Sequence, residues 1–399
     1  MNSSPSYWRI FLVLSGLAIL SPLALDTFLP AVDDAAKSLN TNIGNIMISF
    51  GVLSVGVALG QIIHGPLSDR YGRKPIVVWG LIFYMMSSLL TPFVLSIELF
   101  YSLRFIQGLA VAATMIVMRS IVRDLFSVKE GAKLFANLFV ILAIIPIIGP
   151  IIGGHLTIWF GWQSVLFLMA GISAIVLLTT VVLFEESLPK KDPDALKLNK
   201  LLSNFNEIIT ERNFLTFLLI GVGAYAGLYG VITGIAPVMT GLLRQQANVF
   251  GYQFAAIMIG HFISAAIAGK LVHILGIKKL LFIGTLISMI GGLLLIGASL
   301  LGVITIYSIL IPSTLFLLGF ALTIPGMTAG ALSNFQHMAG RATSLLGFIQ
   351  HGTGAFVSIT LAYIADGSTS MPMAIAIAVA SLFAFISFII RIPRTILKA

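Results

Sequence analysis

Two charged residues of opposite sign stand inside long apolar stretches of this chain. Asp26 lies 17 residues after Arg9, which corresponds to ~25 Å along a helix. Arg104 follows Glu98 by six residues, in a stretch that we expect to run in the opposite direction, so it lies ~9 Å below that end of its helix. The two charges are therefore predicted to sit at comparable depth.

A charge within a membrane costs at least ~2.5–3.5 kcal/mol on insertion scales, so each of these residues needs a partner, a watery cavity or a function. Opposite signs at matched depth favour pairing between Asp26 and Arg104. A cavity that alternates between wet and dry, or a pair that forms and breaks, would let Asp26 load and release a proton. The alternative is a static ion pair that holds the first membrane helix against the fourth.

The elements that must position these charges are membrane helices. The chain has 399 residues, of which 58% are hydrophobic and 9% charged, with a mean hydropathy of +1.06. A hydrocarbon core of ~30 Å needs ~20 apolar residues per helix, and such runs recur along nearly the whole chain. The runs are continuous rather than alternating, which argues against a barrel. We expect an all-α integral membrane protein without a soluble domain.

The apolar runs predict twelve transmembrane helices, and the first run is expected to be retained because it is too long for a signal-peptide core and lacks a small-residue cleavage site. One polar segment, 185–212, divides the chain into an N-terminal six-helix bundle (1–184) and a C-terminal six-helix bundle (213–399). The predicted spans are 8–30, 43–64, 76–96, 99–121, 134–157, 164–184, 214–240, 250–272, 278–300, 303–330, 342–365 and 371–391.

Lysine and arginine residues gather on one side of these spans. With the N-terminus in the cytoplasm, the outer side keeps little more than Lys37 and Arg244. This bias predicts a multi-pass protein of the plasma membrane, in a bacterium the inner membrane, with both termini cytoplasmic. It also accounts for the net charge of +9 without any nucleic-acid partner.

Several kinds of chemistry find no support in the sequence. The chain has no cysteine, which excludes disulfides and cysteine-based metal sites. It shows no metal-ligand cluster and no G-x-x-x-x-G-K-[ST] phosphate loop, which argues against direct drive by ATP. It also lacks a constellation of nucleophile and base. We therefore expect no enzyme, no cofactor and no metal site.

A charged turn follows the second predicted span. Its glycines allow a tight bend and close helix contact, Asp69 can pair with basic groups or lie at a helix N-terminus, and the basic side chains anchor the inner face. The alternative is a positive-inside turn with no further role. The residues that define this turn are Gly65, Asp69, Arg70, Gly72, Arg73 and Lys74.

A weak internal repeat supports two related halves. The pattern Gly65-x-x-x-Asp69-x-x-Gly72-x-Lys74 aligns without gaps to residues 269–278, where the corresponding residues are glycine, histidine, glycine and lysine. Both copies follow the second span of their half. Parallel repeats of six helices are typical of rocking transporters with a site near the midplane. The second copy lacks the acid and two arginines, so the halves differ at this face.

The turn closely resembles the signature loop of the major facilitator superfamily, G-x-x-x-D-R-x-G-R-[RK]. Residues 147–154 resemble the G-P-x-x-G-G motif of its antiporters through Gly149, Pro150, Gly153 and Gly154. Glycine and proline lower helix rigidity and permit close packing, as a gate helix requires.

Other stretches are similar to the bicyclomycin-resistance (Bcr/CflA) subgroup of drug:proton antiporters. Residues 104–108 resemble the R-x-x-Q-G motif associated with proton coupling. Residues 26–30, 123–126 and 342–350, together with Gln61, resemble that subgroup.

The resemblance implies two pseudo-symmetric bundles that rock around a central cavity and export amphipathic small molecules in exchange for protons. It implies that Asp69 helps to latch the cytoplasmic face closed in the outward-open state. We expect Asp26 to carry the proton, with Arg104 as its partner. The expected partners are a small-molecule substrate, protons and the lipid bilayer, and the expected state is a monomer.

Seven further residues in the apolar spans are candidates for the substrate cavity. The tyrosines could stack on a bulky ligand, the glutamines could line the cavity, and the histidines could titrate near neutral pH. Packing or helix–helix hydrogen bonds are the alternative for each. In the next inner loop, Asp124 or Arg119 could bridge to the turn at Asp69. The cavity candidates are Gln61, Gln107, Tyr225, Tyr229, His261, Gln350 and His351.

Two other functions stay open at this stage. One is a dedicated carrier of a metabolite such as a siderophore, an amino acid or a sugar, although a strongly polar substrate should require more polar cavity residues. The other is a transport-dead receptor or scaffold on the same fold, which would not need Asp26.

Overall fold

The computed structural model describes residues 7–335, 338–365 and 368–391, and within these ranges the secondary structure is helical. Residues 1–6, at the start of the first predicted bundle, and residues 392–399, at the end of the second, lie outside the described ranges. The helices are α1 (Tyr7–Asp26), α2 (Val32–Ser38), α3 (Ile43–Tyr71), α4 (Arg73–Leu90), α5 (Ile97–Leu125), α6 (Val128–Phe160), α7 (Gln163–Leu183), α8 (Leu198–Thr210), α9 (Arg212–Ala236), α10 (Ala247–Leu300), α11 (Ile306–Leu332), α12 (Ala339–Ile364) and α13 (Met371–Arg391).

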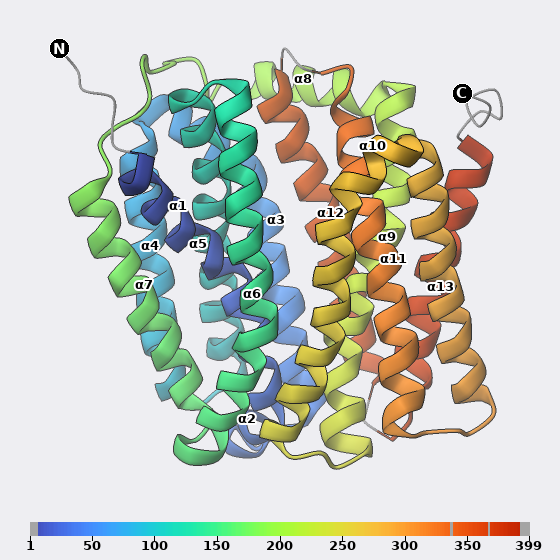
Figure 1. Cartoon of the computed structure of the whole chain (residues 1–399). Helices are drawn as coiled ribbons and strands as arrows, with labels where there is room; N and C mark the ends of the chain where they lie inside the picture. The colour runs from blue at the N-terminus through green and yellow to red at the C-terminus, as the bar shows by residue number, and fades with distance from the viewer. Residues whose placement is uncertain (1–6, 336–337, 366–367, 392–399) are drawn as a thin grey trace.

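The 54-residue helix α10 contains two membrane spans. Its backbone leaves the helical conformation at Gly276, where φ is 76° and ψ is 159°. Glycine accepts a positive φ without steric penalty, so the chain can reverse there and return as a second leg (Figure 1). Eleven helices of the described residues are long and apolar enough to span a membrane. Counting both legs of α10 gives the twelve predicted spans.

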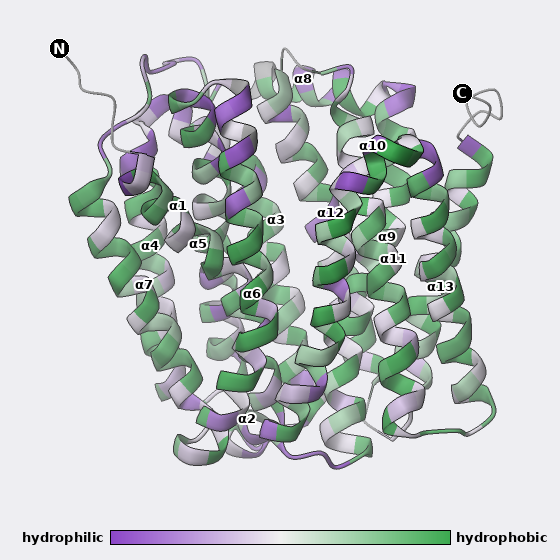
Figure 2. Ribbon diagram, viewed as in Figure 1, coloured by the Kyte–Doolittle hydropathy of each residue, from purple (hydrophilic) through white to green (hydrophobic). Residues whose placement is uncertain are grey.

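Polar residues gather at the two ends of the helices, and the band between them is mainly apolar (Figure 2). Helix α1 begins and α13 ends at the same end of the molecule, which also carries α8 (Figure 1). We call this end the linker face. The other end carries α2, and we call it the α2 face. The apolar band fits the hydrocarbon core that the sequence predicts.

Helices α1–α7 lie on one side of the molecule and α9–α13 on the other (Figure 1). The two groups meet mainly where α3 packs on α12 and α6 packs on α10. Glycines make these approaches possible: a Cβ at Gly51 would overlap the side chain of Ile359, and one at Gly154 would meet the carbonyl of Ala247. Close backbone contact through small residues is how membrane helices gain packing energy.

The polar segment between the two groups contains a helix that we did not expect. Helix α8 lies along the linker face (Figure 1), and its Phe205 and Ile208 pack against Phe214 and Phe335. Apolar residues at a spacing of three to four lie on one face of a helix. That pattern was present in the sequence, but the many polar residues of the segment obscured it.

Candidate transport site and gating turn

Asp26 is the last residue of α1. The predicted span ran to residue 30, but the α-helix ends earlier and a short 3-10 turn, Leu29–Ala31, follows with Pro30 in it. Proline lacks the N–H that an α-helix needs, which explains the early break. The Asp26 side chain is buried, with 7% of the residue exposed, and it makes no hydrogen bond or ion pair within the described residues.

Arg104 is fully buried near the same break. Its guanidinium donates to Gln107 Oε1 at 2.6 Å and to the carbonyl of Ala24 at 3.1 Å. The guanidinium also lies over the rings of Phe28 and Phe50, with its central carbon 5.1 Å and 5.3 Å from their centroids. Neutral acceptors and aromatic faces therefore surround this cation.

The expected ion pair between Asp26 and Arg104 is not formed in this structure. The two residues do lie at similar depth, as predicted, because Arg104 reaches the carbonyl of Ala24, two residues before Asp26. The hydrogen bonds of Arg104 go to an amide and a carbonyl instead, which fix the guanidinium beside α1 without using the carboxylate. A depth estimate cannot reveal this, because it says nothing of the direction in which a side chain points.

The two predicted cavity glutamines of this half are buried between helices. Gln107 accepts from Arg104 and donates to Ser88 Oγ at 2.7 Å, which joins α5 to α4. Gln61 lies against Gly347 of α12, and its Oε1 has no hydrogen-bond partner. Gln107 thus follows the helix–helix alternative, whereas Gln61 lies at the contact between the two halves.

Four predicted residues of the second half come together around one added aromatic ring. The hydroxyl of Tyr229 lies 2.9 Å from His351 Nδ1, and Tyr225 makes an edge contact with the same imidazole at 6.0 Å between centroids. Phe320 contacts Tyr225 at 5.6 Å and stacks with His261 at 5.7 Å. We call these five residues the aromatic cluster. Phe320 escaped sequence analysis because nothing distinguishes it from other phenylalanines in apolar spans.

The remaining candidate, Gln350, lies next to His351 in α12. It is buried and contacts Met327 Sδ at 3.6 Å.

The glycine- and proline-rich stretch of α6 packs against the break in α1. A Cβ at Gly149 would overlap Thr27 Oγ1, and a Cβ at Gly153 would overlap the carbonyl of the same threonine. On its other side, Gly154 and Pro150 contact the first turns of α10. The stretch therefore touches both the residue after Asp26 and the opposite half of the molecule.

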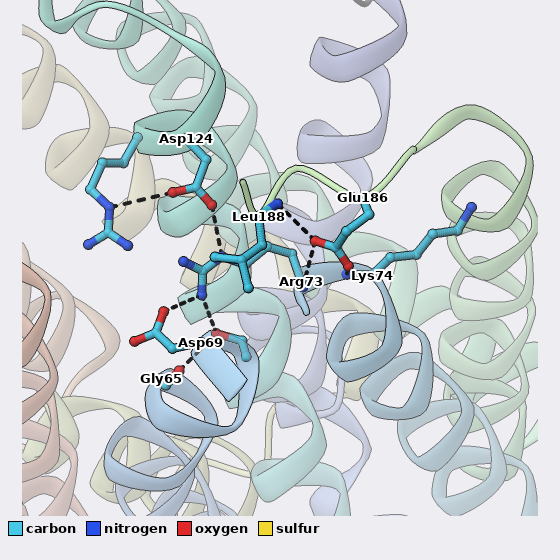
Figure 3. Close-up of polar contacts among 9 residues, drawn as sticks. Gly65, Asp69, Arg73, Lys74, Asp124, Glu186 and Leu188 are labelled. Atoms are coloured by element: carbon cyan, nitrogen blue, oxygen red, sulfur yellow. Dashed lines mark hydrogen bonds and ion pairs between the residues drawn. The ribbon is translucent and has the colours of Figure 1, made fainter. Parts of the chain in front are cut away.

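The charged turn between α3 and α4 forms a polar network around Arg73 (Figure 3). Arg73 is 1% exposed. Its guanidinium donates to Asp69 at 2.6 Å, to Ser68 Oγ at 2.7 Å and to Asp124 at 2.8 Å. We expected either Asp124 or Arg119 to bridge to this turn. The structure contains the bridge from Asp124, through Arg73. The network joins α3, α4 and α5 within one half of the molecule.

Glu186 completes this network from a position more than a hundred residues away along the chain. Its carboxylate accepts from the backbone N–H groups of Arg73 at 2.9 Å, Lys74 at 3.1 Å and Leu188 at 3.0 Å (Figure 3). It thereby caps the N-terminus of α4, where an acid is favourable. Gly72, with φ of 117°, lies so close that a Cβ would overlap this carboxylate. No local sequence signal marks Glu186 as a cap.

The other basic residues of the turn have separate contacts. The Lys74 ammonium donates to the carbonyl of Val181 at 2.9 Å, and the exposed Arg70 lies over the ring of Tyr71 at 5.5 Å. A cavity of about 540 Å³ lies beside the turn, with Gly65 and Asp69 on one wall and Ser344 of α12 among the residues of the other. The turn is thus tied within its own half, and this cavity lies between Asp69 and the first residues of α12.

Comparison with known proteins identifies the architecture. The model of the Major Facilitator Superfamily matches residues 14–359. The chain belongs to this superfamily. It is a multi-pass membrane transporter rather than an enzyme, and the predicted resemblance to this superfamily is confirmed.

Relatives within the superfamily are named for drug resistance. The chain is 25% identical to a bicyclomycin resistance protein homolog of Haemophilus influenzae, over 91% of each chain. It is 23% identical to multidrug resistance protein D of Escherichia coli, over 88% of each chain. It is 26% identical to a chloramphenicol resistance protein of Pseudomonas aeruginosa, over 86% of this chain and 83% of that protein.

Solved structures of other transporters share the fold. A D-xylose–proton symporter superposes with a TM-score of 0.73 at 16% identity, covering 98% of this chain and 99% of the symporter. A nucleoside transporter superposes with a TM-score of 0.69 at 13% identity, covering 96% and 100%. These likenesses confirm the arrangement of two six-helix bundles in this superfamily member.

Proposed function

We propose that this chain exports amphipathic small molecules in exchange for protons, by alternating access in a bacterial inner membrane. The names of its relatives, which refer to resistance to bicyclomycin, chloramphenicol and multiple drugs, support a drug-type substrate. The observation that carries the proposal is Asp26, a buried carboxyl without a hydrogen-bond or ion-pair partner in the described residues. In this proposal the linker face is cytoplasmic, as the lysine and arginine bias predicts.

Asp26 would exchange the proton through a change of surroundings. Burying its charge costs several kcal/mol, about 2.5 or more on insertion scales, and binding a proton removes that cost. Opening the site to water makes the charged form affordable again, so the proton leaves. Arg104, held beside α1 by Gln107 and the carbonyl of Ala24, would supply a fixed positive field near this carboxyl. It need not form a direct ion pair to do so.

Substrate binding is proposed at the aromatic cluster of the second half. Tyr225, Tyr229 and Phe320 offer flat apolar faces, and the two tyrosines add hydroxyl groups at their edges, which suits amphipathic molecules. Asp26 and this cluster belong to opposite bundles, so rocking of the bundles would couple occupancy of the cluster to the proton site. The transporter would act as a monomer, with 1–184 and 213–399 as its two moving bundles and 185–212 as their cytoplasmic linker.

The turn at Gly65–Lys74 is proposed as the cytoplasmic latch. Cavities of about 440 Å³ at the α2 face and about 540 Å³ at the linker face lie between the bundles, but at the α2 face the backbones also touch closely at Gly154 and Ala247. In this proposal the structure is a state with the outer side closed. When the bundles rock, α12 would approach the turn, and Asp69 could then bind its first residues. The α6 stretch at Gly149–Gly154 would act as the outer gate.

Proton movement in proteoliposomes tests the proposal. Amphipathic drugs, including chloramphenicol and bicyclomycin, are added to vesicles that contain the native chain, Asp26→Asn or the control Asp34→Asn. We expect drug-dependent proton movement with the native chain and with Asp34→Asn, because Asp34 is a partly exposed residue of α2 that pairs with Lys37. Asp26→Asn should abolish it. No movement with any drug would remove the antiport proposal, and equal movement in all three proteins would exclude Asp26 as the proton carrier.

A further inference from the structure

The cavity at the linker face contains more positive charge than its acids neutralise. Its wall includes three arginines, Arg119 and Arg123 from α5 and Arg341 from α12, and two acids, Asp69 and Asp192. Asp69 is already bound to Arg73, outside the cavity lining, at 2.6 Å. The net charge of the cavity lining is therefore positive, and the arginines that cause it come from both bundles.

Of the three arginines, Arg119 is the one whose charge is least balanced by a neighbouring acid or hydrogen-bond acceptor. Arg123 has Asp124 at 3.7 Å, whereas neither Arg119 nor Arg341 has an ion pair or hydrogen bond within the described part of the chain. Arg119 is only partly exposed, in contrast to Arg123. A cation that merely anchors a loop at the membrane face would reach water freely. A half-buried cation without a partner indicates that something else supplies the counter-charge.

Apolar side chains make up most of the rest of the cavity wall, together with the hydroxyl groups of Ser120, Thr343 and Ser344. The volume of about 540 Å³ is in the range of small-molecule pockets. A molecule with an apolar body and an anionic group would match both the wall and the cation. The apolar side chains are Ile62, Ile116, Phe135, Leu201, Phe205 and Met338.

We propose that this cavity is an entry site for amphipathic organic anions, with Arg119 as the residue that binds the carboxylate or equivalent anionic group. Arg341 supports it from the opposite bundle. This inference rests on the proposed export function and narrows its substrates to include anionic amphiphiles taken from the cytoplasm. Guanidinium and carboxylate form two parallel hydrogen bonds, which gives Arg119 its selectivity for the anionic group.

A matched pair of fluorescent probes tests the site. Binding of 1-pyrenebutyric acid and of its neutral amide is measured on the purified full-length protein, reconstituted in zwitterionic lipid. We expect the native chain to bind the carboxylate about tenfold more tightly than the amide, and Arg119→Gln to remove that preference while leaving amide affinity unchanged. Arg119→Lys should keep part of the preference. The control Arg9→Gln, at an exposed residue of α1, should keep all of it.

Several outcomes would overturn the proposal. Equal binding of carboxylate and amide by the native chain would do so, as would loss of both probes in Arg119→Gln together with Arg119→Lys. A lipid headgroup shares the chemistry of the anionic group, so the titration is repeated with phosphatidylglycerol in the vesicles. Displacement of the carboxylate probe by this lipid would reject a cytoplasmic small molecule as the occupant. Binding requires no proton movement, so failure here leaves the test of Asp26 unaffected.

Discussion

The two turns that the internal repeat aligns have the same backbone shape and different surroundings. Gly72 and Gly276 occupy equivalent positions, with φ of 117° and 76° and ψ of 160° and 159°. In the first turn Arg73 is 1% exposed and joined to two carboxylates, whereas its counterpart Ile277 is 37% exposed. A Cβ at Gly276 would meet nothing within 4 Å, unlike one at Gly72.

Both copies of the glycine pattern thus reverse the chain, but only the first copy has the polar contacts. The first turn is held by Asp69 from its own loop, by Asp124 from α5 and by Glu186 from the linker. Within the described residues, the side chains of 269–278 make no hydrogen bond or ion pair. The contrast fits a proposed latch in one bundle that works against a less constrained partner.

The largest difference between the turns should appear on removal of the buried cation. Arg73→Met leaves the buried Asp124 carboxylate with only the longer contact to Arg123, at 3.7 Å, and we expect a loss of about 3 kcal/mol in the free energy of unfolding. Ile277→Met at the aligned position should change it by less than about 1.5 kcal/mol. Denaturant unfolding in detergent, followed by tryptophan fluorescence, compares the two. Similar losses would show that the network around Arg73 contributes no more than ordinary packing.

The aligned glycines offer a second comparison. An alanine at either position must adopt a positive φ with ψ near 160°, a region that costs about 1–3 kcal/mol. Gly72→Ala should cost about 1 kcal/mol more than Gly276→Ala, because its Cβ displaces the Glu186 carboxylate from the N-terminus of α4. The same unfolding measurement applies, with the double variant Gly72→Ala and Glu186→Ala as a check. If Gly276→Ala is the more damaging of the two, the proposed role of Glu186 is wrong.

The linker acid provides a smaller effect with a neighbouring control. Glu186→Ala removes the acceptor for three backbone N–H groups and should destabilise the protein by about 1 kcal/mol, as for other lost helix caps. Glu185→Ala, at an exposed residue next to it, should change stability by less than about 0.5 kcal/mol. Thermal unfolding of both variants in the same detergent separates them. Equal shifts in the unfolding temperature would mean that the hydrogen bonds of Glu186 add nothing to the effect of removing one negative charge.

The smallest effect is expected on rebuilding the ion pair in the second turn. His273→Asp with Ile277→Arg reproduces the spacing of Asp69 and Arg73. Without counterparts of Asp124 and Glu186, the new pair remains exposed and should contribute only about 0.3–0.5 kcal/mol. A double-mutant cycle on unfolding free energies measures the coupling. A coupling energy as large as that around Arg73 would show that the spacing of the two residues in the sequence is enough to form a stabilising ion pair, without Asp124 and Glu186.

Sequence patterns were enough to predict the membrane class, the twelve spans, the reversal at the two aligned glycines and the superfamily. Hydropathy and glycine conformation act locally along the chain, so they can be recognised without coordinates. The break after Asp26 and helix α8 were also encoded locally, by Pro30 and by a spacing of apolar residues, although the sequence interpretation passed over both.

The tertiary structure alone decided which polar groups meet. Arg104 and Asp26 were correctly placed at similar depth, yet Arg104 binds Gln107 and the carbonyl of Ala24. Glu186 reached the N-terminus of α4 from the linker, and His351 met Tyr229 from a different helix. Such contacts depend on helix rotation and side-chain direction, which differ by whole faces of a helix for small changes in packing. Sequence spacing constrains depth in the membrane but leaves that rotation undetermined.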